Sequence, residues 1–191
     1  MKHLLTSILL LSLCSTATAQ SSPPSGYTWT ENSSNGHYYA FTDVKSWADA
    51  QSEAVAVGCN LVTIRNQSEQ DWLFSTFVSQ VTPVGLHIGF NDINVEGTWE
   101  GGSGEPVTFE NWDPIGAEPS NSYGGEDEAI IWSNNASSVT PGKWNDAHST
   151  QFHGIIEWRP TTVYVDQSGN GDYTDIQSAI DWSINGDTVI V

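Results

Sequence analysis

Oxygen-bearing side chains gather in three short segments of the chain. These are Glu118-Pro119-Ser120, Glu126-Asp127 and Trp144-Asn145-Asp146. Together they offer carboxylate, amide and hydroxyl oxygens, which are the ligands that Ca²⁺ prefers in proteins. This pattern indicates calcium-dependent binding rather than bond-breaking chemistry.

Motifs of common enzyme classes do not occur in the sequence. It contains no G-x-S-x-G elbow, phosphate-binding loop or zinc-binding helix motif. The histidines lack the spacing of metal ligands, so we expect structural roles for His37, His87, His148 and His153. We therefore predict that this chain is not an enzyme.

The net charge is -18, from 23 acidic and five basic residues. Such a surface repels phosphate backbones and anionic lipids, which disfavours nucleic acid and membrane partners. Adaptation to a salty medium would explain scattered carboxylates such as Glu31 and Glu53. It does not explain why acidic residues concentrate between Glu118 and Glu128.

The first 26 residues have the pattern of a leader and a linker. A positive start, a short apolar run and Ala17-Thr18-Ala19 predict a signal peptide over residues 1–19, hence a secreted protein. A lipid anchor on Cys14 is the alternative, which the bulky Leu13 disfavours. Residues 20–26 are predicted to be a polar linker.

Helical and strand patterns then alternate through the first half of a predicted domain over residues 27–158. Strands are expected at Tyr38 to Phe41 and Leu61 to Ile64, and a helix at Ser46 to Val57. A second helix is expected to begin with Ser68 as N-cap and Asp71 three residues later.

Short apolar segments separated by turn residues follow, and they predict strands. The expected strands are Leu86 to Phe90, Gly97 to Trp99, Val107 to Phe109, Ala129 to Trp132 and Gly154 to Trp158. The polar stretch from Glu110 to Gly125 is expected to be a long loop, and loops of that length are usually functional.

Cys59 is the single cysteine left after removal of the leader, so no internal disulfide can form. Its neighbours favour a small buried side chain, with an intermolecular disulfide as the alternative.

Taken together, these features resemble the C-type lectin domain, from about Gly36 to Trp158. The resemblance rests on the two helices, the His87-Ile88-Gly89-Phe90 strand, the three oxygen-rich segments and the closing segment Gly154 to Trp158. It implies an α+β fold with short antiparallel strands and a long loop region that binds calcium and sugar. It also implies a cis peptide bond before Pro119.

The resemblance assigns the ligands of a principal Ca²⁺, with two vicinal sugar hydroxyls completing the shell. These ligands, which would also bind the carbohydrate, are Glu118, Ser120, Glu126, Asn145 and Asp146. A possible auxiliary Ca²⁺ would be held by Asp92, Glu96, Asn121, Glu126 and Asp127.

Two departures from the family pattern affect these expectations. Ser120 stands where mannose-type members carry Asn, although Glu118 is retained, which favours mannose over galactose. The four framework cysteines are replaced by Ala54, Glu128, Ser149 and Ile156. Bound calcium and tryptophan packing would compensate for the missing bridges.

Residues 161–191 resemble the opening turn and capping helix of a right-handed parallel β-helix, as found in pectin-acting enzymes. The similar segments include Gly169 to Tyr173, Ile176 to Ile180 and Gly186 to Val191. A catalytic β-helix would then follow in a longer parent protein.

Two functions are compatible with this reading. The first is a secreted, calcium-dependent carbohydrate-binding module that directs a larger protein to a glycan or polysaccharide. The second is a protein-binding or ice-binding surface on the same fold, with no sugar bound.

Overall fold

The computed structural model describes residues 22–103, 107–122, 124–169, 171–183 and 187–191. The predicted signal peptide lies outside these ranges. Among the described residues, no helix has the length and apolar character needed to cross a membrane.

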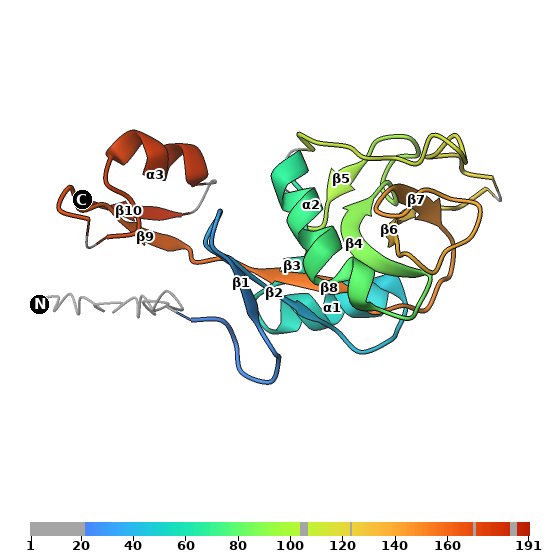
Figure 1. Cartoon of the computed structure of the whole chain (residues 1–191), viewed down its shortest axis with the longest axis horizontal. Helices are drawn as coiled ribbons and strands as arrows, with labels where there is room; N and C mark the ends of the chain where they lie inside the picture. Colours follow the sequence, from blue (N-terminus) through green and yellow to red (C-terminus); the bar gives the residue numbers. More distant parts are fainter. Residues whose placement is uncertain (1–21, 104–106, 123, 170, 184–186) are drawn as a thin grey trace, which may run out of the picture.

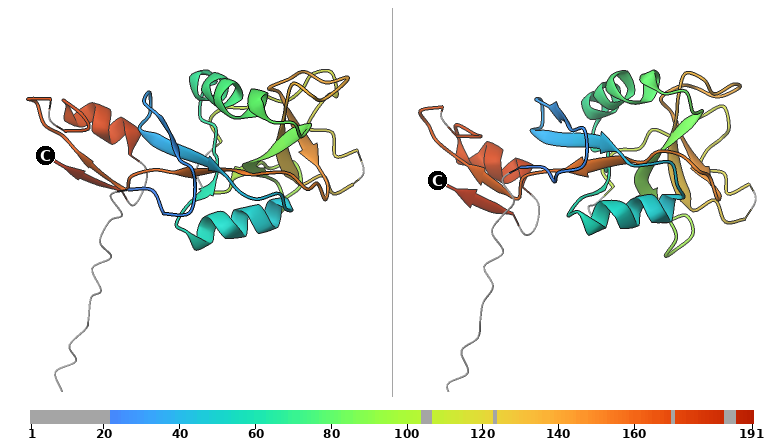
Figure 2. Two further views of the ribbon diagram at one scale, coloured as in Figure 1. Left: turned by 60° about the horizontal axis from the view of Figure 1, so that its bottom comes forward. Right: turned by 90° about the horizontal axis from the view of Figure 1, so that it is seen from below.

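The first sheet joins the two ends of the predicted domain. Its strands run in the order β1 (Thr30–Asn32), β2 (His37–Phe41), β8 (Ile155–Trp158) and β3 (Asn60–Leu61), and all its pairings are antiparallel. Figures 1 and 2 show α1 (Trp47–Ala56) and α2 (Gln67–Thr76) on opposite sides of this sheet. A short 3-10 helix, η1 (Val78–Gln80), follows α2.

Helix α1 forms where the sequence pattern predicts it. Ser46 is the N-cap, and its side chain accepts a hydrogen bond from the backbone N–H of Asp49. Trp47, Ala50 and Ala54 recur at helical spacing and are buried. Their burial on one face attaches α1 to the first sheet.

Helix α2 begins two residues earlier than expected. Its N-cap is Asn66 rather than Ser68, and Asn66 Oδ1 accepts the backbone N–H of Glu69 at 2.9 Å. This earlier start points Glu69 inward, where the Tyr39 hydroxyl donates to its carboxylate at 2.6 Å. A contact far along the chain therefore favours the earlier of the two possible caps.

The second sheet lies at the other end of the molecule and is also antiparallel. Its order is β5 (Glu100–Gly101), β4 (Gly85–Asn91), β6 (Glu128–Trp132) and β7 (Trp144–Ala147). Gly89 in β4 lies against the first sheet, and a Cβ there would stand 2.4 Å from the carbonyl oxygen of Leu61. Only glycine permits this close approach.

Three expected strands do not form as predicted. Of Leu61 to Ile64, only Leu61 lies in a strand, β3. Gly97 to Trp99 and Val107 to Phe109 lie outside the strands of the second sheet, and strand β5 begins after Trp99. Trp99, Val107 and Phe109 pack their side chains against the core without joining a ladder. Their apolar character reflects packing from loops.

The core has two main clusters within the predicted domain. The larger one contains Tyr39, Leu73, Phe90 and Trp144, and the smaller one contains Cys59 and Leu61. The smaller cluster also holds Ala54 and Ile156, so two positions where the resemblance implies framework cysteines carry buried apolar side chains. Burial raises the pKa of the Cys59 thiol to about 12, as expected for a packed, unreactive cysteine.

The C-terminal residues form a separate β-α-β unit, drawn at the opposite end of Figure 1 from β7. Its elements are β9 (Thr162–Tyr164), α3 (Ile176–Trp182) and β10 (Thr188–Ile190), and the two strands are parallel. Val163, Val165 and Ala179 form its small core. Arg159 is joined to Asp187 by two hydrogen bonds of 2.6 and 3.1 Å, which link this unit to the end of β8.

Candidate functional site

The structure brings the Trp144-Asn145-Asp146 segment against the loop that carries Glu118-Pro119-Ser120. Asp146 in β7 is buried, and its Oδ1 and Oδ2 accept the backbone N–H groups of Ser120 and Asn121 at 3.0 and 2.6 Å. One carboxylate therefore holds the two predicted segments together.

Glu126 lies further along the same loop, and its side chain points back toward Ser120 and Ser122. Its Oε2 accepts the N–H of Ser122 at 2.6 Å and lies 3.5 Å from Ser120 Oγ. Ser120 Oγ and Ser122 Oγ are 2.7 Å apart. The serine hydroxyl thus lies beside a predicted carboxylate ligand.

Glu118 lies in an environment that disfavours its charged form. Partial burial, together with a hydrogen bond to Asp146 and the charges of Asp146 and Glu126, raises its pKa to about 7. Within the described residues, its buried Oε2 has no hydrogen-bond partner. A divalent cation would satisfy this oxygen and offset the mutual repulsion of the three acids.

The backbone around Glu118 has the expected form. The Glu118–Pro119 peptide bond is cis. Gly116 leaves room for the acid, since a Cβ at that position would stand 2.1 Å from Glu118 Oε1. A larger residue at position 116 would therefore force the Glu118 side chain to move.

Asn145 completes the predicted principal set. It lies in β7 next to Asp146, and its side-chain amide donates to the Asp146 carbonyl oxygen. All five predicted principal ligands thus lie on two segments joined by Asp146, and their oxygens suit a hard cation.

The residues predicted for an auxiliary ion divide into two groups. Asp92 is buried, with Oδ2 accepting the Gly97 N–H at 2.7 Å and with no partner for Oδ1 among the described residues. Its own N–H donates to the carbonyl oxygen of Asp127 at 3.1 Å. Glu96 has a raised pKa, caused by loss of solvation and by the charges of Asp92 and Asp127. The charges of Asp92 and Asp127 therefore act on the Glu96 carboxylate.

Asn121 is used differently. Its Oδ1 accepts the backbone N–H groups of Gly125 and Glu126 at 2.6 and 3.2 Å. The oxygen that was expected to bind an auxiliary ion thus closes the loop in this structure.

Trp144 is fully buried rather than presented to a ligand. Its ring packs on Phe90, with centroids 4.7 Å apart, and meets Trp112 edge-on at 5.6 Å. Its indole N–H donates to Gln70 Oε1 at 2.8 Å. Sequence reasoning did not single out Gln70, because only the fold brings α2 to β7.

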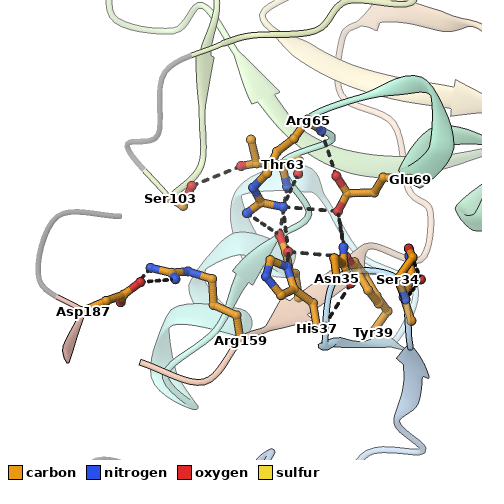
Figure 3. A network of polar contacts seen from close by, with 12 residues as sticks. Ser34, Asn35, His37, Tyr39, Thr63, Arg65, Glu69, Ser103, Arg159 and Asp187 are labelled. Atoms are coloured by element: carbon orange, nitrogen blue, oxygen red, sulfur yellow. Dashed lines mark hydrogen bonds and ion pairs between the residues drawn. The ribbon is translucent and has the colours of Figure 1, made fainter. Parts of the chain in front are cut away.

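A second cluster of acidic and histidine side chains lies at the first sheet, on β2, β8 and the start of α2 (Figure 3). Ligand atoms of His37, Glu69 and Glu157 lie within 4.8 Å of one another. Arg65 already supplies the cation, because its Nη1 donates to Glu157 Oε1 at 2.8 Å and to Glu69 Oε1 at 3.2 Å. This cluster is a buried ion-pair network rather than a metal site.

The two glutamates of this network have opposite pKa shifts. Burial opposes ionisation of Glu157, but Arg65 and His37 outweigh it and hold the pKa of Glu157 well below its ordinary value. Glu69, by contrast, has a raised pKa because of burial and the neighbouring charge of Glu157. His37 thus has the structural role expected from the sequence.

Comparison with known proteins shows which family this chain is similar to. The family model described as "Lectin C-type domain" matches residues 43–156. Lectin BRA-3 of Megabalanus rosa is 32% identical over 141 residues, which cover 72% of this chain and 79% of that protein. Human tetranectin is 31% identical over 113 residues, or 57% of this chain and 52% of tetranectin.

The mouse low affinity immunoglobulin epsilon Fc receptor is 33% identical over 115 residues, or 60% of this chain. The matched part spans only 31% of that receptor and 52% of tetranectin, so the chain corresponds to about half or less of these two proteins.

Solved structures share the fold. Human lithostathine superimposes with a TM-score of 0.58 at 26% identity, covering 72% of this chain and 91% of lithostathine. The carbohydrate-recognition domain of cow CD23 gives a TM-score of 0.57 at 24% identity, covering 72% and 95%. The family match, the relatives and the shared mixed fold of helices and antiparallel sheets agree: the chain belongs to the C-type lectin domain family.

Proposed function

We propose that this chain is a calcium-dependent carbohydrate-binding module. C-type lectin domains bind carbohydrate and are not enzymes. The observation that carries the calcium step is the contact of Asp146 with both Ser120 and Asn121, which sets the acid of β7 beside Glu118 and Glu126. Repelling carboxylates held together in this way favour a bound divalent cation.

The proposed principal ligands are Glu118, Ser120, Glu126, Asn145 and Asp146. A bound Ca²⁺ would supply the Lewis acid that takes up two vicinal sugar hydroxyls. The protein side chains would hydrogen-bond the same hydroxyls: the carboxylates accept hydrogen bonds from them, and the amide of Asn145 can donate hydrogen bonds to them. The order of acids and amides would select the hydroxyl geometry.

A mannose-type preference follows from Glu118, because galactose-binding relatives carry Gln there. Ser120 offers a hydroxyl that can both coordinate and donate, at a shorter reach than the family's Asn. We expect binding that is selective for mannose-type sugars but weaker than with Asn at this position.

A weaker auxiliary site is proposed at Asp92, Glu96 and Asp127, with Glu126 shared. The buried Asp92 Oδ1 without a partner among the described residues supports it. Asn121 would join only if its Oδ1 left Gly125 and Glu126. Calcium titration should then show one stronger and one weaker binding step.

Export and a targeting role complete the proposal. The leader pattern of residues 1–19 supports secretion, and the parallel pairing of β9 with β10 around α3 supports the opening of a parallel β-helix in residues 161–191. The messenger RNA sequence beyond the codon for Val191 tests the second point. Repeated short β-branched segments are expected, and a stop codon directly after Val191 would contradict it.

Retention of the full chain on immobilised sugars tests the carbohydrate step. In millimolar Ca²⁺ it should bind mannan-agarose more strongly than galactose-agarose, and EDTA should release it. Glu118→Gln should shift the preference toward galactose. If neither matrix retains the chain in calcium, the carbohydrate function is wrong.

The alternative is a protein-binding or ice-binding surface. The fold is shared with a calcium-independent type II antifreeze protein, with a TM-score of 0.57 at 19% identity and with 72% and 94% of the two chains covered. Thermal hysteresis or protein capture that EDTA does not change, together with no retention on sugars, would favour this function.

A further inference from the structure

Asp113 is a fully buried acid in the loop that carries Glu118, and its side chain is bonded on both oxygens. Oδ2 accepts the Thr140 N–H at 2.8 Å, while Oδ1 accepts the Thr140 hydroxyl at 2.9 Å and the Ile115 N–H at 3.0 Å. A buried carboxylate requires such donors. Asp113 therefore ties its own loop to the segment that leads into β7.

The backbone of Asp113 contacts both ligand-bearing segments. Its N–H donates to the Trp144 carbonyl oxygen at 2.8 Å, and its own carbonyl oxygen accepts the Glu118 N–H at 3.0 Å. Trp144 directly precedes Asn145 and Asp146. One residue thus joins the two halves of the proposed ligand set.

A role in stability alone would make Asp113 comparable to Asn32. That residue is also buried, at the end of β1, and its Oδ1 accepts the N–H and the hydroxyl of Ser34 at 3.1 and 2.7 Å. The two differ in place, because Figure 1 shows β1 far from β7. Asn32 therefore provides a matched control.

We propose that Asp113 is a positioning residue of the calcium site. It fixes the spacing between Glu118 and the Asn145-Asp146 pair without binding the ion, since protein donors occupy both of its side-chain oxygens. This inference rests on the proposed calcium function. Residues that orient metal ligands typically contribute about 10-fold to 100-fold to metal affinity.

Isothermal titration of the full chain with CaCl₂ alone tests it. Asp113→Asn keeps the shape of the side chain but removes its charge and replaces one of its two accepting oxygens with an NH₂ group. The affinity for Ca²⁺ should therefore fall by about 10-fold to 100-fold. Thr140→Val keeps the backbone N–H and should lose only a few-fold in affinity. Asn32→Ala should lower Tm and leave the Kd for Ca²⁺ unchanged well below Tm.

The outcomes separate the inference from the proposed function. If the wild type binds Ca²⁺ and Asp113→Asn binds it equally well, Asp113 has no positioning role and the calcium function stands. Equal weakening in Asn32→Ala would also overturn the inference, because the loss would then follow stability. If the wild type takes up no Ca²⁺, the proposed function and the inference both fail.

Should Asp113→Asn not fold, Thr140→Val carries the test. A weaker Kd with a wild-type circular dichroism spectrum supports the role of Asp113, and an unchanged Kd overturns it.

Discussion

The indole N–H of Trp144 donates to Gln70 Oε1 at 2.8 Å, and both side chains are buried. The other end of the same amide, Gln70 Nε2, donates to the Gly142 carbonyl oxygen at 2.8 Å. Helix α2 thus holds the strand that presents Asn145 and Asp146. The proposed site depends on a side chain that would contact neither ion nor sugar.

Gln70→Ala should destabilise the protein by about 1–3 kcal/mol, because it leaves the buried indole N–H of Trp144 without a partner and removes one of two side-chain donors to the Gly142 carbonyl oxygen. Urea unfolding monitored by tryptophan fluorescence measures this loss. Gln67→Ala, on the exposed side of the same helix, serves as the control and should change stability by less than about 0.5 kcal/mol. Equal effects would show that the Gln70 contacts are unimportant.

Arg65→Met should cost about 3–5 kcal/mol, since it leaves the buried Glu69 without its cation and leaves Glu157 with His37 as its remaining basic partner. Lys45→Met removes one partner of the more exposed Lys45–Glu53 pair and should cost at most about 1 kcal/mol. The free energies of unfolding in urea give both values. A small loss for Arg65→Met would contradict the network in Figure 3.

Acid should weaken the fold through His87. Burial lowers its pKa to about 4, against about 6.5 in the unfolded chain. The unfolded state therefore binds more protons between these values, so this stability is present above pH 6.5 and is lost as the pH falls toward 4. The loss reaches about 2 kcal/mol at pH 5.

The His87→Gln variant isolates the contribution of His87 to the pH dependence of stability. Unfolding free energies at pH 7.5 and pH 5.0 should differ by about 2 kcal/mol less in the variant than in the wild type, since glutamine does not titrate. If both proteins show the same pH dependence, His87 does not contribute to acid sensitivity.

Ser120→Asn should strengthen mannose binding several-fold in saturating Ca²⁺. The amide restores an oxygen for the ion and a donor for the sugar, with a longer reach than the serine hydroxyl. Competition with free mannose on mannan-agarose measures the change. Unchanged or weaker binding would indicate that the loop, including the Ser120 and Ser122 hydroxyl pair, is already adapted to serine.

Local pattern was enough to predict much of the fold. The period of Trp47, Ala50 and Ala54 predicted α1, and apolar runs predicted β4, β6 and β8. The start of α2 could not be chosen locally, because Asn66 and Ser68 both precede an acid by three residues. Burial of Glu69 beside Tyr39 decides it.

Partners distant in sequence account for the remaining differences. Arg65 and Glu157 are 92 positions apart, and Gln70 and Trp144 are 74 apart, so no short motif contains either pair. Asp113 was missed because a single acid before a proline in a polar loop resembles an ordinary turn residue. By contrast, the family resemblance indicated the acids around Glu118, since their order along the chain carries the pattern.

Calcium binding by Asp146 tests the account most directly. Titration of the wild type with CaCl₂ should show saturable uptake. Asp146→Asn should weaken the affinity for Ca²⁺ by at least about 10-fold, because the variant loses a negative charge and the oxygen that accepts the Asn121 backbone N–H. Asp71→Asn, an exposed acid on α2, should bind as the wild type does. Calcium uptake by Asp146→Asn equal to that of the wild type would contradict the proposed site.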